Sequence, residues 1–366
     1  MSTKNILFLL IMSICLVLIN IHGLASDLQI GGEMNASLIG LFDTELGIGA
    51  IPQASVDVEL FFPPWDNNEL KCEGLFYTDI EAGEIDFFLK KLYWKHKYDN
   101  LQLSIGRQPI SWSFGSLLNP VDFTLGSVAL EEESNSKFQN AVEAYFPINC
   151  NTSLSLVVAL PEMNSKPKLG IRARTLVEGF DLTFNLVHEP VDEGGDTLPQ
   201  QRIGITAKGD VGAFGVYGAL GYYKQKSNDF SVLGGIDYSY FFDAGNQLYF
   251  QWEYLSIPQQ YLDQITGSVL PEMQKGETEN VGLLIRNTTY HIDEFSNISL
   301  TSFSNLAEGS RVIMPSYSNQ VNTNATINIS AGMKIEEIQN QLIPSFESIF
   351  NNPPQVFLEI GISYAF

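Results

Sequence analysis

Alternation of apolar and polar residues limits what this chain can form more than any other feature of its sequence, because it recurs along the whole length. The segment TNATINISAGMKI, residues 323–335, places Ala, Ile and Met at every second position, with Thr, Asn, Ser, Gly or Lys between them. The closing segment QVFLEIGISYAF, residues 355–366, alternates in the same way. A period of two indicates β-strands, and no segment offers a sustained helical period. We therefore expect an all-β fold.

Gly, Asn, Asp and Pro residues divide the alternating pattern into eighteen predicted strands. Most of them have roughly the 9–11 residues with which a tilted strand crosses a bilayer. The predicted strands are 28–40, 53–62, 70–80, 84–98, 101–112, 137–148, 152–161, 167–178, 180–189, 200–209, 213–224, 229–242, 246–257, 281–292, 296–305, 311–319, 323–335 and 354–366.

The links between these strands differ in length according to their order. Links after even-numbered strands are mostly short, and links after odd-numbered strands include the long segments 113–136, 190–199, 258–280 and 336–353. Outer-membrane barrels combine short periplasmic turns with long extracellular loops. We therefore predict a transmembrane, antiparallel, up-and-down β-barrel of about 18 strands (16–18), with both chain ends on the periplasmic side.

The first 25 residues match a secretory signal peptide. Lys4 precedes an apolar run of 14 residues, and Gly23 and Ala25 follow it as small residues near a cleavage site. The run is short for a membrane-spanning helix, although an uncleaved anchor stays an alternative. We predict a signal peptide at 1–25, a single barrel domain at 26–366, and export to the outer membrane of a diderm bacterium.

The mature chain is strongly acidic. Removing residues 1–25 leaves 19 Lys and Arg against 42 Asp and Glu, a net charge of −23. A nucleic-acid-binding protein needs a basic face, so that class is excluded. The two remaining cysteines, Cys72 and Cys150, are too few for a disulfide framework, and two unpaired thiols are favoured over a single bridge.

Aromatic residues near strand ends favour a membrane barrel over a soluble, secreted β-sandwich, which would also alternate. Interfacial girdles of outer-membrane barrels have this distribution. The residues are Tyr145, Phe146, Tyr222, Tyr223, Tyr238, Tyr240, Tyr254, Tyr290 and Tyr364. In hydrocarbon every backbone group must be paired, so the last strand is expected to meet the first.

Two stretches resemble known outer-membrane proteins. The terminal strand, with Tyr364 and Phe366 at its end, resembles the signal by which the barrel assembly machinery recognises its substrates. The stretch LQLSIGRQPISWSFGSLLNPVDF resembles the Gly-Arg-Gln strand, then Trp and Asn-Pro, of a branch of porin-like proteins. The matching residues are Gly106, Arg107, Gln108, Trp112, Asn119, Pro120 and Asp122. That branch usually has Gly after the Trp, where this chain has Ser113, so the likeness does not extend to the path of the following loop. The resemblance implies a channel, without naming its solute. It leaves the oligomeric state open, with a homotrimer as one option because porins of this kind are often trimers.

Charged strand residues are predicted to point into the barrel, because Arg or Lys on the lipid face costs roughly 2–4 kcal/mol at the bilayer midplane. Rings of charge set the ion preference of such pores. Alternatively, the charges only satisfy one another across strands. The pore-lining candidates are Arg107, Arg172, Arg174, Arg202, Lys208, Arg286, Lys334, Glu33, Glu143, Asp181, Asp237, Glu253 and Glu359.

Arg107 and the loop after it are the candidates for a constriction. A regular strand would direct Arg107 to lipid, but Gly106 and Pro109 predict a bulge or an early strand end that turns it inward. Alternatively, Arg107 lies above the membrane or ties the next loop to the wall. That loop narrows the pore if it folds inward; outside, it is solvated or binds divalent cations. Its acidic candidates are Asp122, Glu131, Glu132 and Glu133.

One basic cluster, KKLYWKHKY at 90–98, lies near the predicted periplasmic end of the barrel. Either it forms a channel exit that favours anions, or it contacts phosphate headgroups. Catalysis finds no support in the sequence. His96, His188 and His291 lack metal-ligand spacing, and no Gly-x-Ser-x-Gly motif occurs. We predict no enzyme activity, no metal and no cofactor.

The sequence therefore predicts an outer-membrane porin for passive diffusion of small hydrophilic solutes or ions, with cations favoured by the net charge. A channel selective for anions or oligosaccharides, using Arg107, Arg172 and Arg174 with Tyr249 as a stacking surface, is the nearest variant. From another class, an adhesin or structural barrel with an incidental pore is the alternative. The expected partners are outer-membrane lipids, the barrel assembly machinery and small hydrophilic solutes.

Overall fold

The computed structural model describes residues 28–43, 47–79, 84–110, 112, 138–160, 166–193, 196–224, 228–242, 245–258, 280–306, 309, 311–335 and 356–366. The signal peptide proposed at 1–25 lies outside these ranges and stays a prediction.

Eighteen strands form one antiparallel sheet, which confirms the sequence-based count. In the part of the chain that the structure describes, no helix is long and apolar enough to cross a membrane. The strands are β1 (Gln29–Asp43), β2 (Gly47–Phe61), β3 (Asn68–Asp79), β4 (Glu84–Lys97), β5 (Gln102–Pro109), β6 (Phe138–Pro147), β7 (Thr152–Ala159), β8 (Lys168–Val177), β9 (Phe180–Glu193), β10 (Asp196–Val211), β11 (Phe214–Lys224), β12 (Asn228–Phe241), β13 (Gln247–Pro258), β14 (Asn280–His291), β15 (Ser296–Asn305), β16 (Arg311–Gln320), β17 (Ala325–Ile335) and β18 (Val356–Ala365).

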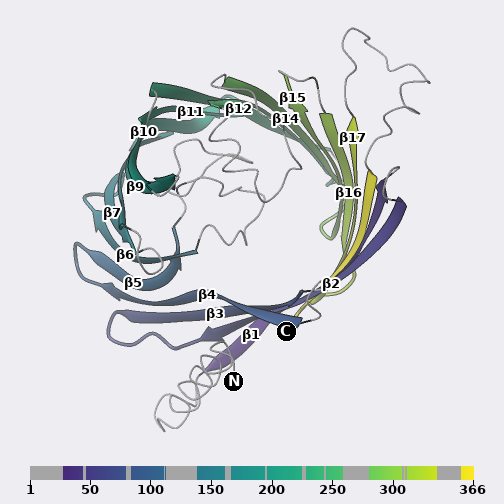
Figure 1. Cartoon of the computed structure of the whole chain (residues 1–366), viewed down its shortest axis with the longest axis horizontal. Helices are drawn as coiled ribbons and strands as arrows, with labels where there is room; N and C mark the ends of the chain where they lie inside the picture. Colours follow the sequence, from purple (N-terminus) through teal and green to yellow (C-terminus); the bar gives the residue numbers. More distant parts are fainter. Residues whose placement is uncertain are drawn as a thin grey trace.

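The sheet closes on itself. β1 pairs with β2 along one edge and with β18 along the other, so the last strand meets the first as predicted. Closure extends to the final residue, because Gly32 and Phe366 exchange two backbone hydrogen bonds of 3.1 and 3.0 Å. Viewed down the barrel axis, the strands follow one another around a ring (Figure 1). Such a sheet has no unpaired edge, which is the condition for placing strands in hydrocarbon.

The link lengths follow the predicted order. Every link after an even-numbered strand has between two and six residues, and the longest links follow β5, β13 and β17. Because β1 begins and β18 ends at the short-link end of the barrel, both ends of the sheet lie on that side. This asymmetry is typical of outer-membrane barrels.

The prediction of a long loop at 190–199 is wrong. β9 continues to Glu193 and β10 begins at Asp196, and the two prolines that suggested a loop, Pro190 and Pro199, stand directly opposite each other. The neighbouring strands β8 and β11 make no pairs with the hairpin at that level. The missing amide hydrogens of the prolines therefore cost no ladder hydrogen bond there.

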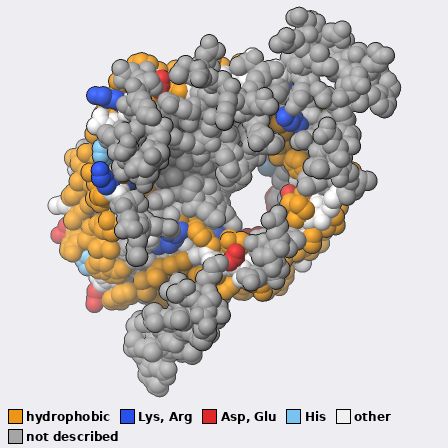
Figure 2. Space-filling model, viewed as in Figure 1, with side chains coloured by type: hydrophobic (Ala, Val, Ile, Leu, Met, Phe, Trp, Pro, Cys, Tyr) orange, Lys and Arg blue, Asp and Glu red, His pale blue; other side chains and the backbone are white. Residues whose placement is uncertain are grey.

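The two faces of the wall differ in polarity. In β1, Ile30, Met34 and Leu38 are 63%, 48% and 51% exposed, whereas Glu33 and Ser37 point to the opposite face. Hydrophobic side chains cover much of the outside of the barrel in Figure 2, and charged groups border its hollow. Soluble monomers rarely leave so continuous an apolar surface in water.

Two residues of the predicted aromatic girdles face inward. Tyr145 pairs with the buried inner residue Ser155, and Tyr223 is 0% exposed. Their neighbours Phe146 and Tyr222 take the outward positions, because adjacent residues of a strand point to opposite faces. The remaining girdle candidates share the outer face with exposed hydrophobic residues; they are Tyr238, Tyr240, Tyr254, Tyr290 and Tyr364.

Candidate functional site

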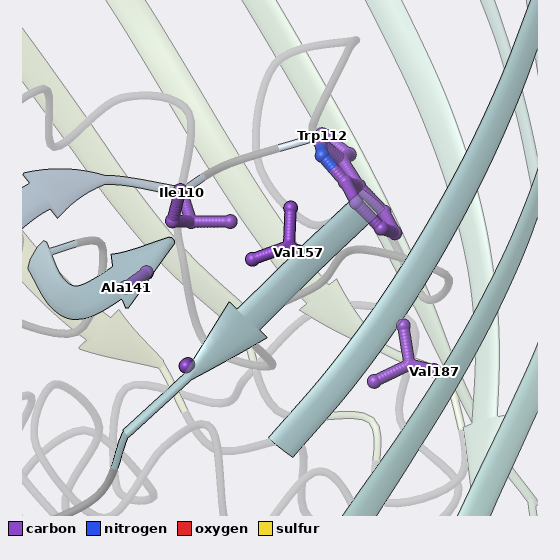
Figure 3. Packing of buried hydrophobic residues seen from close by; sticks show 6 residues of the cluster. Ile110, Trp112, Ala141, Val157 and Val187 are labelled. Carbon is purple, nitrogen blue, oxygen red and sulfur yellow. The ribbon is translucent and has the colours of Figure 1, made fainter. Parts of the chain in front are cut away.

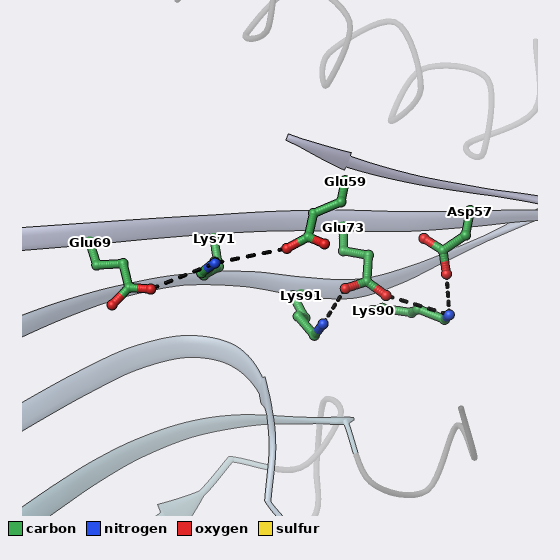
Figure 4. A network of polar contacts seen from close by, with 7 residues as sticks. All are labelled: Asp57, Glu59, Glu69, Lys71, Glu73, Lys90 and Lys91. Atoms are coloured by element: carbon green, nitrogen blue, oxygen red, sulfur yellow. Dashed lines mark hydrogen bonds and ion pairs between the residues drawn. The ribbon is translucent and has the colours of Figure 1, made fainter. Parts of the chain in front are cut away.

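An ionic ladder crosses the inner faces of β2, β3 and β4 (Figure 4). Lys90 forms ion pairs with Asp57 and, at 3.5 Å, with Glu73. Lys91 pairs with the other carboxylate oxygen of Glu73. The side chain of Lys90 is only 1% exposed and those of its two acids are about a tenth exposed, 11% and 10%. A charge buried to this degree is tolerated because its partners are within contact distance.

A β-bulge explains how two consecutive lysines reach one carboxylate. The register of β3 with β4 shifts so that Glu73 faces Lys91 while Gly74 faces Leu89, which leaves Lys90 as the additional residue. A bulge sets two residues of one strand against one of its partner. Two adjacent lysines in an otherwise alternating strand are the signal that could have revealed this site. Its acids were not among the sequence-based candidates.

The other branch of the ladder is more open. Lys71 lies 3.9 Å from Glu59 and 3.7 Å from Glu69, and its side chain is 30% exposed. Two further residues of the basic cluster, Lys95 and Lys97, share the inner face with Lys91, so most of the cluster belongs to the barrel lining. The ladder thus mixes fixed internal pairs with groups that solvent can reach.

The Gly-Arg-Gln motif lies beside the bulge. Gly106 has a φ of +131°, and a Cβ there would come within 2.2 Å of the carbonyl oxygen of Leu92, so only glycine fits. Arg107 donates from Nε to the carbonyl of Leu89, and its guanidinium carbon lies 4.8 Å from the ring centroid of Phe88. Phe88 is an inner residue, because it pairs with Leu75 on the same face as the ladder. The predicted irregularity near Gly106 is therefore present. Arg107 nevertheless keeps an outward register, because it pairs with Leu92, which is 47% exposed, and its guanidinium reaches back over β4 to Phe88.

The chain after β5 packs against the inner wall. Ile110 and Trp112 are 2% and 4% exposed and belong to a buried cluster with Ala141, Val157 and Val187 (Figure 3). Val157 and Val187 lie between outward-facing residues of β7 and β9, so the cluster is inside the barrel.

Gln108 fixes the start of this segment. Its side chain is 3% exposed and donates to the backbone carbonyl of Ala141 at 3.2 Å. The motif residues Gly106, Arg107, Gln108 and Trp112 thus have structural roles that hold the strand end and turn the chain inward. The loop acids Asp122, Glu131, Glu132 and Glu133 lie outside the described residues, so a constriction formed by them stays a prediction.

A second charged sector lies on the inner faces of β8, β9 and β10. Glu189 is held between Lys168 at 3.1 Å and Arg202 at 2.5 Å. Arg174 and Asp181 form a pair with two contacts, at 2.6 and 2.9 Å. The side chain of Arg202 is 2% exposed and that of Arg174 is 54% exposed. Arg202 is therefore part of the wall, whereas the side chain of Arg174 is open to solvent.

The register places most of the predicted lining residues on the inner face. These are Arg172, Arg174, Arg202, Lys208, Lys334, Glu33, Glu143, Asp181, Asp237, Glu253 and Glu359. Burial separates them into two groups. Glu253, for example, is 1% exposed and accepts a hydrogen bond from the hydroxyl of Tyr217. Glu33 and Glu359 are partly exposed on the inner face.

The prediction that Arg286 lines the pore is wrong. Arg286 pairs directly with Trp252, which is 56% exposed on the outer face. Packing inside the barrel sets the orientation of this stretch, because its inner positions are apolar and almost fully buried. These positions are Leu255, Ile257, Val281, Leu283 and Ile285.

A polar hollow lies on the inner wall where the barrel closes, across β17, β18, β1, β2 and β3. Its volume is about 590 Å³. Neutral amides and hydroxyls dominate its polar lining, which comprises Asn35, Ser37, Gln53, Ser55, Tyr77, Thr78, Asn328, Ser330 and Glu359. The carboxylate of Glu359 accepts a hydrogen bond from the hydroxyl of Ser330 at 3.3 Å. Figure 2 shows a passage through the barrel beside this part of the wall.

Cys72 and Cys150 form no disulfide bond with each other. Within the described ranges, no group of three or more His, Cys, Asp or Glu residues is arranged to hold a metal ion.

Comparisons with known proteins identify the fold. No family model and no curated protein matches the chain. Among solved structures, OccAB3 of Acinetobacter baumannii is similar over 93% of this chain and 99% of its own, with a TM-score of 0.56 and 6% identity. OccAB4 of the same organism is similar over 95% of this chain and 100% of its own, with a TM-score of 0.54 and 8% identity. The chain has the fold of an outer-membrane β-barrel.

A third similar structure is Wzi of Escherichia coli, an outer-membrane protein involved in group 1 capsule assembly and described as a carbohydrate-binding β-barrel. It covers 91% of this chain and 83% of its own, with a TM-score of 0.56 and 11% identity. At identities this low, the likeness establishes the architecture alone.

Proposed function

We propose that this chain is a passive channel of a bacterial outer membrane for small hydrophilic solutes and ions. The observation that carries the proposal is a closed barrel with an apolar outer wall, a charged inner wall and a passage beside the closure (Figure 2). An eighteen-stranded barrel is wide enough to leave an aqueous channel. The fold shared with Wzi, which is described as an outer-membrane protein, supports the same location.

Cation preference is the finer part of this proposal. Glu33 and Glu359 are partly exposed on the wall that borders the passage, and Glu33 stands directly opposite Asp57. The nearest buried lysine, Lys90, is held in ion pairs. Two carboxylates on this wall are thus partly open to solvent while the nearby Lys90 is neutralised, and charges that line a pore set its ion preference.

Current measurements in planar lipid bilayers test both the channel and its cation preference. The purified mature barrel should give stable conductance steps, and a salt gradient should give a reversal potential of the sign expected for cation preference. Replacing Glu33 and Glu359 by Gln should move that potential toward zero. Asp293→Asn, which removes a carboxylate from a short turn between β14 and β15, is the matched control and should leave it unchanged. A correctly folded barrel without conductance would overturn the channel proposal.

Selectivity for oligosaccharides is the second candidate, favoured by the polar hollow at the closure. Amides, hydroxyls and the ring of Tyr77 offer hydrogen bonds and a stacking face to a polyhydroxylated solute. The description of Wzi as a carbohydrate-binding barrel points in the same direction. Neutral oligosaccharides should then block the ion current in a saturable manner, and Tyr77→Ala should relieve that block with little change in conductance. Linear, unsaturable dependence on sugar concentration would exclude this candidate.

Export, assembly and oligomeric state complete the proposal. The signal peptide at 1–25 would direct export, and Tyr364 and Phe366 would be recognised by the barrel assembly machinery. Tyr364 lies on the outer face at the end of β18, where such a signal is accessible. A homotrimer is the proposed assembly. The adhesin alternative depends on the long loops, which lie outside the described residues.

A further inference from the structure

Two arginines lie on the outer face of the barrel across β14, β15 and β16. Arg286 of β14 is directly opposite Ser302 of β15, and Arg311 of β16 is directly opposite Ser304. Directly paired residues share a face, and Arg286 also pairs with the outward-facing Trp252. All four residues therefore point away from the lumen, and both arginines are exposed. We call Arg286, Ser302, Ser304 and Arg311 the arginine patch.

The patch begins within the apolar belt and extends toward the long-link end. Arg286 is five residues from the last residue of β14, which places it roughly 13 Å above the short-link end for a tilted strand. Arg311 is the first residue of β16, at the opposite end. The register offset of two residues over two strands separates their Cα atoms by about 12 Å. Two extended arginine side chains reach across such a distance to one small anion.

Nothing on the described part of the chain neutralises these arginines. No described residue forms an ion pair or hydrogen bond with Arg286 or Arg311. Among strand residues whose exposure is described, none on the outer face is Asp or Glu. The described outer wall of a second copy of this chain therefore offers no carboxylate to meet the patch. An exposed arginine in hydrocarbon is costly unless its guanidinium finds an anion or extends to the headgroup layer.

We infer that the arginine patch binds the phosphate of a lipid headgroup in the leaflet at the long-link end. This inference rests on the membrane location in the proposed function. Guanidinium groups donate paired hydrogen bonds to phosphate oxygens, and the hydroxyls of Ser302 and Ser304 lie between the two arginines as further donors. A side chain of Arg286 that extends along the wall toward Arg311 would carry its charge out of the hydrocarbon. Trp252, beside it, has the ring type enriched at membrane interfaces.

The test counts lipids bound to the purified, folded barrel in detergent by native mass spectrometry. The probes are diphosphoryl lipid A, the same glycolipid without phosphates, and inorganic phosphate. The wild-type barrel should retain diphosphoryl lipid A, and the double substitution R286Q and R311Q should weaken that binding by about tenfold. The double variant K166Q and K208Q removes the same charge away from the patch, with Lys208 on the inner face, and should bind the lipid as the wild type does.

Each other outcome overturns the inference in a recognisable way. Equal binding by the wild type and the arginine variant means that the patch is not the site. Equal retention of the phosphate-free glycolipid means that acyl chains alone are recognised, and retention of inorganic phosphate without lipid means that the site binds a free anion. A shift from oligomer to monomer in the arginine variant, with lipid binding unchanged, means that the patch contacts a second copy. Conductance in bilayers separates failure of this inference from failure of the channel proposal, because the outward-facing variants should conduct normally.

Discussion

The inner wall of β2–β4 and the inner wall of β13–β14 are buried to a similar degree by opposite chemistries. On the first, Lys90 is 1% exposed and compensated by Asp57 and Glu73. On the second, Leu255 and Ile257 are 0% exposed. Both walls come from strands that alternate in sequence. Polarity therefore marks the inner face in β2–β4 but not in β13–β14.

The difference between the two walls shows where charged residues mark the inner face of a strand and where they do not. A charged side chain avoids lipid at a cost of roughly 2–4 kcal/mol, which orients β2–β4 correctly. In β14 the inner positions are occupied by Leu283 and Ile285, which pack inside the barrel, and Arg286 takes the outer position. An arginine that reaches an interface or an anion loses much of that cost. Packing inside the barrel then decides the orientation.

Gly106→Ala, beside the charged wall, is expected to cause the largest loss of folding stability. The new Cβ would meet the carbonyl oxygen of Leu92 at 2.2 Å and Cα of Tyr93 at 2.8 Å, at a φ of +131°. We expect a loss of at least about 3 kcal/mol, and hence little folded barrel. The measurement is the gel-mobility difference between heated and unheated protein. Gly234→Ala, with no atom within 4 Å of its Cβ, is the control and should fold normally.

Lys90→Met tests whether buried ion pairs hold the charged wall. Removing one partner of a buried pair typically costs about 3–5 kcal/mol, because the remaining carboxylates lose their counter-charge. Lys71→Met, whose side chain is 30% exposed, should cost no more than about 1 kcal/mol. Urea titrations of the barrel in lipid bilayers give both values. Adding Asp57→Asn to Lys90→Met should recover part of the loss, and equal effects of the two lysine variants would contradict the distinction.

Leu255→Ala makes the matching test on the apolar wall. The cavity left by a fully buried leucine should cost about 3 kcal/mol in the same urea titration. Leu220→Ala, at a site 53% exposed on the outer face, should cost much less because lipid fills the space. A small effect at Leu255 would mean that the inner apolar residues of β13 are not packed, and the comparison between the two walls would fail.

The smallest change in folding stability is expected from substitution of Asp293, which lies in a turn outside both walls. Its carboxylate accepts hydrogen bonds from the hydroxyl of Ser296 at 2.7 Å and the backbone N–H of Phe295 at 2.8 Å. These bonds, that from Ser296 first, lower the pKa of Asp293 below its ordinary value. A lowered pKa in the folded state gives a contribution that is complete above the unfolded value of about 4 and is lost as the pH falls through the folded value.

Asp293→Asn should therefore reduce stability slightly at pH 7, and the difference from the wild type should disappear in acid. Urea titrations at the two pH values measure this. A difference that persists undiminished in acid would assign the effect to the loss of turn geometry and not to ionisation.

The sequence alone determined the strand count, the closure of β1 on β18 and the order of short and long links. These follow from period-two alternation and strand length, which are local properties. It also pointed to Gly106 as an irregularity, since glycine followed closely by proline disfavours regular pairing. The motif around Arg107 was located differently, by its resemblance to a branch of porin-like proteins.

Only the tertiary structure decided which face of β14 is inside, why Pro190 and Pro199 can share a hairpin, and which acids compensate Lys90. Each of these depends on neighbours distant in sequence: the packing inside the barrel, the level at which β8 and β11 stop pairing, and the bulge that turns two lysines to one side. Alternation specifies two faces of a strand. Which face is buried is set by the contacts each face makes after the barrel has closed.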